Sequence, residues 1–293
     1  MPSVEKQNPK QVVRPQNNGS ILSGAIPVEQ VENRFINMVL YGINRVGKTT
    51  LACQFPKPLL LISFEPGTSG GSASVRKVQG VHFVRITKKA DAIALARELR
   101  TDKVYKTHVL DTCTSLQDSI LQELMGLEDA PAVQLNWGTV PEDYYRERSE
   151  QAKEVMRFFR DLPAHTVFVA QEKDHNPVKE ERNRLVRGPR LESFFAADLG
   201  SATVKWMHDA CDYVGRLYLA PEVKETVVER VVNGVKKQFK NQVETGKWVR
   251  RLQTMFTPPF FAGFRSATPG MVPEFIHEPT FEKILKVING EKL

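Results

Sequence analysis

Residues 42–49 read GINRVGKT, which fits the pattern G-x-x-x-x-G-K-[ST]. The apolar run FINMVLYG (35–42) precedes this stretch, and TTLACQF (49–55) follows it with residues compatible with a helix. Glycines in such a loop let the backbone wrap around a polyphosphate, with N–H groups pointing inward at the positive end of the helix. Lys48 would reach the outer phosphates and the Thr49 hydroxyl would ligate Mg²⁺. The pattern predicts a nucleotide-binding loop made of Gly42, Ile43, Asn44, Arg45, Val46, Gly47, Lys48, Thr49 and Thr50.

Apolar runs alternate with helix-compatible segments on both sides of this loop. This alternation predicts an α/β fold with a mostly parallel sheet and helices on both faces. The expected strands are 34–42, 58–64, 80–86, 107–110 and 165–172, and the expected helices are 89–99, 115–127 and a long one that ends near 162.

The final third of the chain has a different pattern. Residues 213–220 and 247–256 have strand-like patterns, and 226–239 centre on Asn233-Gly234, a strong hairpin signal. A helix is expected over 281–289. We expect antiparallel strands that extend the edge of the parallel sheet, whereas 173–201 read as a long charged loop.

The composition of the chain excludes a fibrous or wholly disordered protein. The 293 residues include 41 Lys and Arg against 34 Asp and Glu, a formal net charge of +7, in an ordinary globular composition. No apolar run approaches the ~20 residues of a membrane helix, and three widely spaced cysteines favour a reducing cytoplasm. We expect a cytoplasmic protein without a membrane partner. Residues 1–33 should form a flexible arm, and 34–293 one domain.

Three polar residues follow strands whose carboxyl ends should meet at the edge that carries the loop. Asp111 ends a short strand and could hold Mg²⁺ through water, or could cap the next helix. Glu65 follows PLLLISF and could activate the attacking water, or could be a solvated turn residue. Gln171 could sense the γ-phosphate, or could bond only to backbone at the end of its strand.

These motifs together carry a family resemblance. The loop, Glu65-Pro66-Gly67, Val109-Leu110-Asp111-Thr112 and Ala170-Gln171-Glu172 resemble the RecA-like ATPases of bacteriophages. The chain looks most like the phage nucleotide-binding AAA-type family, which includes core-only relatives of RecA linked to single-strand annealing. The resemblance covers roughly 34–290 and includes the closing segments 211–222, 250–265 and 281–288.

The resemblance implies a RecA-like P-loop fold that uses ATP and Mg²⁺ in a bacterial host. By this resemblance Lys48 and Thr49 bind nucleotide and magnesium, Asp111 is the second magnesium-site acid, and Glu65 activates water. The sequence departs from the family at two places. Ser63 stands where relatives often carry Asp, and the segment Ala262-Gly263-Phe264-Arg265 lacks the lysine of Ala-Lys-x-Arg. Arg265 alone is left to reach a neighbour's ATP in a homo-oligomer.

In RecA-like proteins, the loops after the Asp-bearing strand's helix and after the Gln-bearing strand face single-stranded DNA. Cations and aromatic rings suit such a site, although the rings could instead pack the fold and the charges could be solvated. The segment 131–148 supplies Trp137, Tyr144, Tyr145, Arg146 and Arg148. The segment 173–201 supplies Lys173, Lys179, Arg182, Arg184, Arg187, Arg190, Phe194 and Phe195, with Glu180, Glu181 and Glu192 diluting their charge.

The leading hypothesis is therefore an ATPase that acts on single-stranded DNA in phage recombination or replication, with an annealing or single-strand-binding protein as a partner. An Asn-Lys-x-Asp guanine signature is absent, which favours ATP over GTP. One alternative is a P-loop kinase for a small molecule, with the arginines of 173–201 as its lid. Another is a nucleotide-switched assembly module with little turnover.

Overall fold

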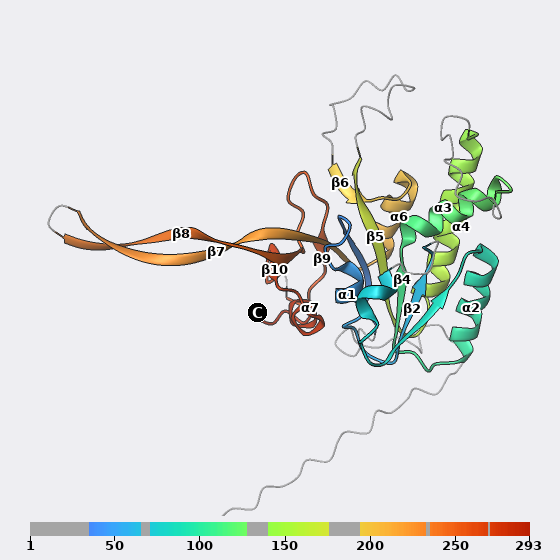
Figure 1. Cartoon of the computed structure of the whole chain (residues 1–293), viewed down its shortest axis with the longest axis horizontal. Coiled ribbons are helices and arrows are strands. Elements are labelled where there is room, and N and C mark those ends of the chain that lie inside the picture. The colour runs from blue at the N-terminus through green and yellow to red at the C-terminus, as the bar shows by residue number, and fades with distance from the viewer. Residues whose placement is uncertain (1–34, 66–70, 128–139, 176–193, 233–234, 269) are drawn as a thin grey trace, which may run out of the picture. The chain divides into compact units, whose positions relative to one another are not determined.

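The computed structural model describes residues 35–65, 71–127, 140–175, 194–232, 235–268 and 270–293 (Figure 1). Phe35–Leu293 cluster into one compact unit. The expected arm (1–33) lies outside the described residues. Within those residues, no helix has both the length and the apolar character needed to cross a bilayer.

A ten-stranded sheet forms the centre of the described chain, with the order β10-β8-β7-β1-β5-β4-β2-β3 and with β6 and β9 paired to β5 and β7. The strands are β1 (Asn37–Gly42), β2 (Leu59–Ser63), β3 (Val81–Arg85), β4 (Thr107–Asp111), β5 (His165–His175), β6 (Phe194–Ala197), β7 (Tyr213–Val232), β8 (Val235–Gln253), β9 (Gly263–Phe264) and β10 (Phe275–His277). The helices are α1 (Lys48–Ala52), the 3₁₀ helix η3 (Gly71–Val75), α2 (Lys89–Thr101), α3 (Cys113–Leu124), α4 (Glu142–Arg160), α6 (Ser201–Ala210) and α7 (Phe281–Ile288).

The parallel part of the sheet runs from β3 through β2, β4, β5 and β1 to β7. Its central strands are buried on both faces, as continuous apolar runs predict for a sheet covered on both sides. One apolar cluster includes Val39, Leu110 and Phe159 on the side of α2, α3, α4 and α6. The other includes Leu40 and Ile284 on the side of α1 and α7. The predicted α/β architecture, a mostly parallel sheet with helices on both faces, is confirmed.

The C-terminal strands differ from expectation in one respect. The strand that begins at Tyr213 joins β1 in parallel, and antiparallel pairing starts only with β8, β9 and β10. The reason is α6, a crossover helix that the sequence pattern did not reveal, which lets β7 run in the same direction as β1.

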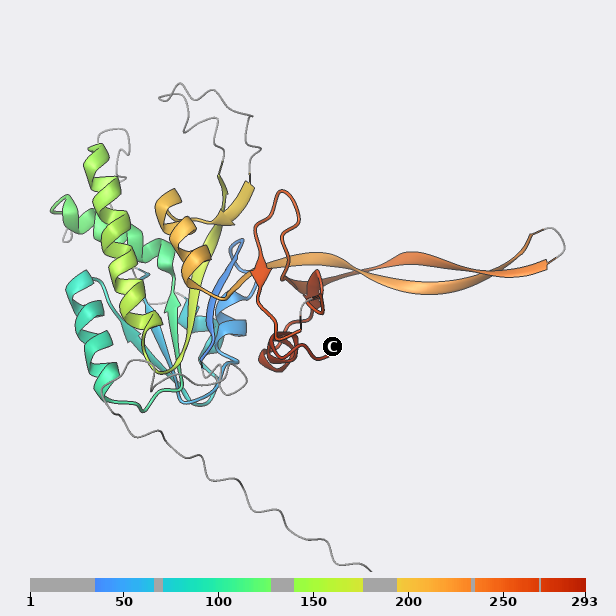
Figure 2. The same cartoon turned by 180° about the vertical axis from the view of Figure 1, so that it is seen from behind.

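The strands β7 and β8 form one long hairpin rather than three separate strands. Pairing continues to Val232 and Val235, on either side of the expected Asn233-Gly234 turn, and the register shifts between Pro221 and Val223. Beyond that irregularity the two strands pair only with each other among the described residues, and the ribbon extends away from the sheet (Figures 1 and 2).

The expectation of a loop over 173–201 is partly wrong. The strand β5 continues to His175 and pairs antiparallel with β6, and α6 begins at Ser201. The chain between them, 176–193, lies outside the described residues. Likewise, α4 begins at Glu142, so the second half of 131–148 is helical.

Candidate functional site

The predicted phosphate loop connects the end of β1 to the start of α1 at the carboxyl edge of the parallel strands. Two of its residues adopt left-handed backbone, Arg45 with φ 65° and Gly47 with φ 99°. A Cβ added at Gly42 would lie 2.2 Å from the carbonyl oxygen of Leu217 in β7. The neighbouring strand therefore leaves room only for glycine at the start of the loop.

Lys48 lies inside this loop and is almost fully buried, with 7% of its surface exposed. Its Nζ donates hydrogen bonds to the carbonyl oxygens of Gly42 and Ile43, both at 2.8 Å. Burial lowers the pKa of Lys48, and the carboxylates of Asp111, Glu172 and Glu65 oppose that shift. A polyphosphate in the loop would supply further negative charge to this buried cation.

Thr49 in α1 and Asp111 at the end of β4 meet, although β5 lies between β1 and β4 in the sheet. The Thr49 hydroxyl donates a hydrogen bond of 2.7 Å to Oδ2 of Asp111. Burial raises the pKa of Asp111 to about 6, and the hydrogen bond from Thr49 opposes that shift. The cap of α3 is the next residue, Thr112, whose side chain accepts from the N–H of Ser115 at 3.0 Å. A hydroxyl and a carboxylate at this spacing offer the oxygen ligands that Mg²⁺ prefers.

Glu65 lies half-buried after β2, at the same edge. Its negative charge raises the pKa of both Lys48 and Asp111. Its backbone N–H donates to Oγ of Ser63 at 3.3 Å. The serine that replaces the family's aspartate thus bonds to the backbone of the candidate base.

Gln171 is paired in register with Gly42, at the mouth of the loop. Its backbone N–H donates to Oγ1 of Thr114 at 3.2 Å, and its carbonyl accepts from the N–H of Asp198 at 2.6 Å. The backbone of Gln171 is therefore held by residues from α3 and from the segment after β6.

An ion pair beside the loop was not foreseen from the sequence. Arg216 in β7 donates to both carboxylate oxygens of Glu172, at 2.5 and 3.1 Å, and its guanidinium lies 3.5 Å from the ring centre of Phe260. Both charged side chains are nearly buried, with 12% and 7% exposed. Glu172 was visible in the motif Ala-Gln-Glu, but nothing in the sequence links it to an arginine 44 residues away.

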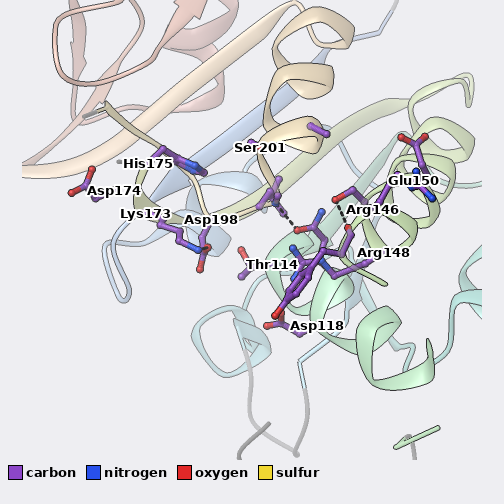
Figure 3. Close-up of a pocket in the computed structure, with 16 residues that line it drawn as sticks. Thr114, Asp118, Arg146, Arg148, Glu150, Lys173, Asp174, His175, Asp198 and Ser201 are labelled. Carbon is purple, nitrogen blue, oxygen red and sulfur yellow. Dashed lines mark hydrogen bonds and ion pairs between the residues drawn. The ribbon is translucent and has the colours of Figure 1, made fainter. Parts of the chain in front are cut away.

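The second candidate site, after the phosphate loop, is a cavity of about 850 Å³ between α3, α4, β5 and the start of α6, called the second cavity from here on (Figure 3). Tyr145, Arg146, Arg148 and Lys173, all predicted to face DNA, line it. Asp118, Glu150, Asp174 and Asp198 add negative charge to its wall.

Arg148 is the most constrained cation of this cavity. Its guanidinium lies 5.3 Å from the ring centre of Tyr145, and its buried Nε has no hydrogen-bond partner among the described residues. Burial lowers the pKa of Arg148, and burial also raises the pKa of Asp118 to about 6. Lys173 lies 3.2 Å from Asp198. The wall thus combines a half-buried cation, an aromatic ring and a largely exposed ion pair.

The other residues predicted to contact DNA are not brought together here. Phe195 packs against Phe260, with ring centres 5.2 Å apart, so it supports the fold as the structural alternative proposed. Tyr144 lies half-exposed on α4. The following residues lie outside the part of the chain that the structure describes: Trp137, Lys179, Arg182, Arg184, Arg187 and Arg190. Of Phe194 only the backbone is described.

Arg265 lies beside β9, which pairs with the first residues of β7. That is the amino-terminal edge of the parallel strands, opposite to the phosphate loop. Its guanidinium forms an ion pair with Asp212, and 71% of the side chain is exposed. Arg265 therefore does not belong to the site of its own chain.

Comparison with known proteins adds a family and a fold neighbour. The model of a family described as AAA domain matches residues 34–247, more than half of the chain. No curated protein sequence matches. Among solved structures, the chain is similar to a KaiC-like protein from the hyperthermophilic archaeon Pyrococcus horikoshii OT3, with 11% identity and a TM-score of 0.36. That similarity covers 83% of this chain and 89% of the archaeal one.

Proposed function

The chain belongs to the AAA domain family, and from this premise we propose that it hydrolyses ATP and acts on single-stranded DNA. The observation that carries the first part is the 2.7 Å hydrogen bond between Thr49 and Asp111, next to the buried Lys48. These are the hydroxyl, carboxylate and ammonium groups that a P-loop needs for magnesium and the outer phosphates.

The site residues divide the work of hydrolysis in the following way. Water attacks the γ-phosphorus, the bond from that phosphorus to the bridging oxygen breaks, and the proton of the water passes to the Glu65 carboxylate. Lys48 offsets the charge of the outer phosphates, while Thr49 and, through water, Asp111 hold the metal. Mg²⁺, when bound, neutralises charge on the β- and γ-oxygens. We propose Gln171, whose Cα is paired with that of Gly42, as the residue that contacts the γ-phosphate.

Glu65 favours hydrolysis over the kinase alternative, because transfer to a small acceptor needs no water-activating base at that position. The test compares three variants by ATP binding and phosphate release. Lys48→Ala should lose binding, whereas Glu65→Gln should bind ATP and release phosphate about 10²–10⁴-fold more slowly. The matched control Glu98→Gln, on an exposed face of α2, should behave as wild type. Normal turnover in Glu65→Gln would show that the base is elsewhere.

The second part, DNA, is supported by the cavity that contains Arg148, Lys173 and Tyr145. A cation stacked on an aromatic ring suits a phosphate next to a base. The four carboxylates in the wall weaken this field, so a measurement of phosphate contacts is needed. Replacing Arg148 and Lys173 by Ala should make the slope of log affinity against log salt shallower by roughly 1.4, at ~0.7 per contact on a single strand. Arg100→Ala, exposed on α2, should leave the slope unchanged. An unchanged slope in the double variant would exclude this cavity as the DNA site.

We also propose that the protein acts in phage recombination with an annealing or single-strand-binding protein as a partner. The sequence resemblance supports both statements. We further propose a homo-oligomer in which Arg265 approaches the nucleotide of a neighbouring copy. Its support is the exposed position of Arg265 at the edge opposite to its own loop. Phosphate release by mixtures of Lys48→Ala and Arg265→Ala chains tests it, because only a mixed assembly could join an intact loop to an intact arginine.

A further inference from the structure

We infer that the end of the β7–β8 hairpin next to the sheet holds the nucleobase of the bound nucleotide, which stacks on Trp248. The inference rests on the proposed function, since it concerns the nucleotide whose phosphates occupy the loop. Such a site would recognise the nucleobase, which the phosphate loop does not do, because backbone N–H groups around phosphates cannot distinguish one base from another.

A cavity of about 520 Å³ carries the inference. Its wall consists of Ile43 from the phosphate loop and of Arg216, Tyr218, Leu219 and Trp248 from the hairpin. The cavity therefore borders the phosphate loop at Ile43, and its size falls in the range of small-molecule sites, about 300–1,000 Å³.

The hairpin is fixed closely against the loop at two points. The carbonyl oxygen of Leu217 closes on Gly42, and Nη1 of Arg250 lies 3.3 Å from where a Cβ of Gly47 would be. Arg250 is held in turn by Glu278, which accepts from its backbone N–H at 3.0 Å and from its guanidinium at 3.4 Å. The hairpin, which supplies four of the five residues that line the cavity, therefore has a defined position relative to the phosphate loop.

Three large apolar side chains of this cavity are exposed together. The exposed fractions are 67% for Trp248, 53% for Ile43 and 44% for Leu219. By contrast, the preceding pair on the same face of the hairpin, Leu217 and Leu252, is fully buried. A cluster of exposed apolar groups beside a polar loop marks a surface that is covered in use.

The chemistry of this surface matches a planar, weakly polar ring. Trp248 presents the largest aromatic face among the side chains, and Leu219 and Ile43 add aliphatic area. A purine attached to phosphates in the loop would remove part of this area from water and stack on the indole. Arg250, next to Gly47, adds a cation on the side of the phosphates.

The test compares ATP with inorganic tripolyphosphate, which has the phosphates and no base. Calorimetric titration of the full chain with Mg²⁺ gives both affinities. Trp248→Ala should weaken ATP binding about 10- to 100-fold, the range for loss of one base–aromatic stack, and leave tripolyphosphate binding unchanged. Trp248→Phe, which keeps a ring, should recover most of the loss. Val243→Ala, an exposed apolar residue further out on the same strand, should change neither affinity.

The outcomes separate this inference from the proposed function. If wild type binds neither ligand, or Lys48→Ala binds both normally, the phosphate-loop assignment is wrong. If wild type binds both but Trp248→Ala loses the two equally or neither, the nucleobase does not lie on Trp248. If Trp248→Ala changes the mass of the assembly in solution but not the ratio of the two affinities, the surface binds a second copy of the chain. That result would overturn the inference.

Discussion

Replacing Asp111 by Asn should stabilise the nucleotide-free protein at neutral pH while it removes stabilisation by ATP with Mg²⁺. Asp111 is 3% exposed, and burial raises the pKa of its carboxyl group from 3.8 to about 6. At about 1.36 kcal/mol for each pH unit, the ionised form costs the folded state about 3 kcal/mol. The pKa of about 6 already includes the attraction of Lys48 and the hydrogen bond from Thr49, and Asn resembles the protonated acid in shape, so the increase in stability at neutral pH should approach about 3 kcal/mol.

The pH dependence gives a sharper signature than the absolute difference. A carboxyl whose pKa is higher in the folded chain contributes stability that is fully present below pH 3.8 and is lost as pH rises through about 6. The amide that replaces it in the variant does not titrate. The free energy of unfolding of the variant minus that of wild type should therefore increase by about 3 kcal/mol from below pH 4 to above pH 7.

Urea unfolding at steps of pH, without nucleotide, measures this difference. A second series with ATP and Mg²⁺ should stabilise wild type by about 2.7 kcal/mol at a hundred times the dissociation constant, and the variant much less. The reasoning fails if the difference between the two proteins is flat across this pH range, or if it declines as pH rises. Either result would mean that Asp111 is not held as a costly buried carboxylate.

Three further predictions concern neighbouring positions. Gly42→Ala should destabilise the fold by about 1–3 kcal/mol through overpacking against β7 and abolish ATP binding, whereas Gly263→Ala, with nothing within 4 Å of the added Cβ, should do neither in urea unfolding and nucleotide titration. Replacing Glu172 by Leu should lower the free energy of unfolding by about 3–5 kcal/mol, because Arg216 is left charged and nearly buried. The double variant with Arg216→Met should recover much of that loss in urea unfolding. If the losses of the two single variants simply add in the double variant, the two side chains are not coupled. Burial lowers the pKa of His108 from 6.5 to about 4, so its contribution to stability is present above pH 6.5 and is lost as pH falls towards 4, by about 3 kcal/mol. The free energy of unfolding of His108→Leu should therefore fall less between pH 6.5 and pH 4 than that of wild type. Equal falls in the two proteins would rule this out.

The elements that the sequence predicted are those with strong local patterns. The phosphate loop, the apolar strands beside it and α7 depend on residues close together in the chain. The strand β6 has only four residues, and α6 buries three, Thr203, Val204 and Met207, so neither produced a clear period. The length of the hairpin could not be predicted, because its outer part pairs with no other strand among the described residues, so pairing with the central sheet does not set its length.

In the site, too, the residues with strong local patterns were predicted and their distant partners were not. Lys48 and Thr49 come from one motif, and Asp111 and Glu65 follow short apolar strands, so their positions at one edge follow from parallel pairing. The partners that surround them come from distant parts of the chain. The contact of Arg216 with Glu172, and the approach of Arg250 to Gly47, exist only because β7 lies next to β1 and β8 lies next to β7.

Gln171 links the phosphate loop to the second cavity through its backbone. Its Cα is paired with Gly42, while its N–H and carbonyl are bonded to Thr114 and Asp198, both in the wall of the second cavity. A shift of this backbone in response to a γ-phosphate must therefore lengthen, shorten or break two bonds in that wall. If a ligand in the second cavity favours one arrangement of those bonds, linkage requires ATP and that ligand to change each other's affinity by the same factor. The direction of that factor depends on which arrangement each ligand favours, and two reciprocal titrations determine it.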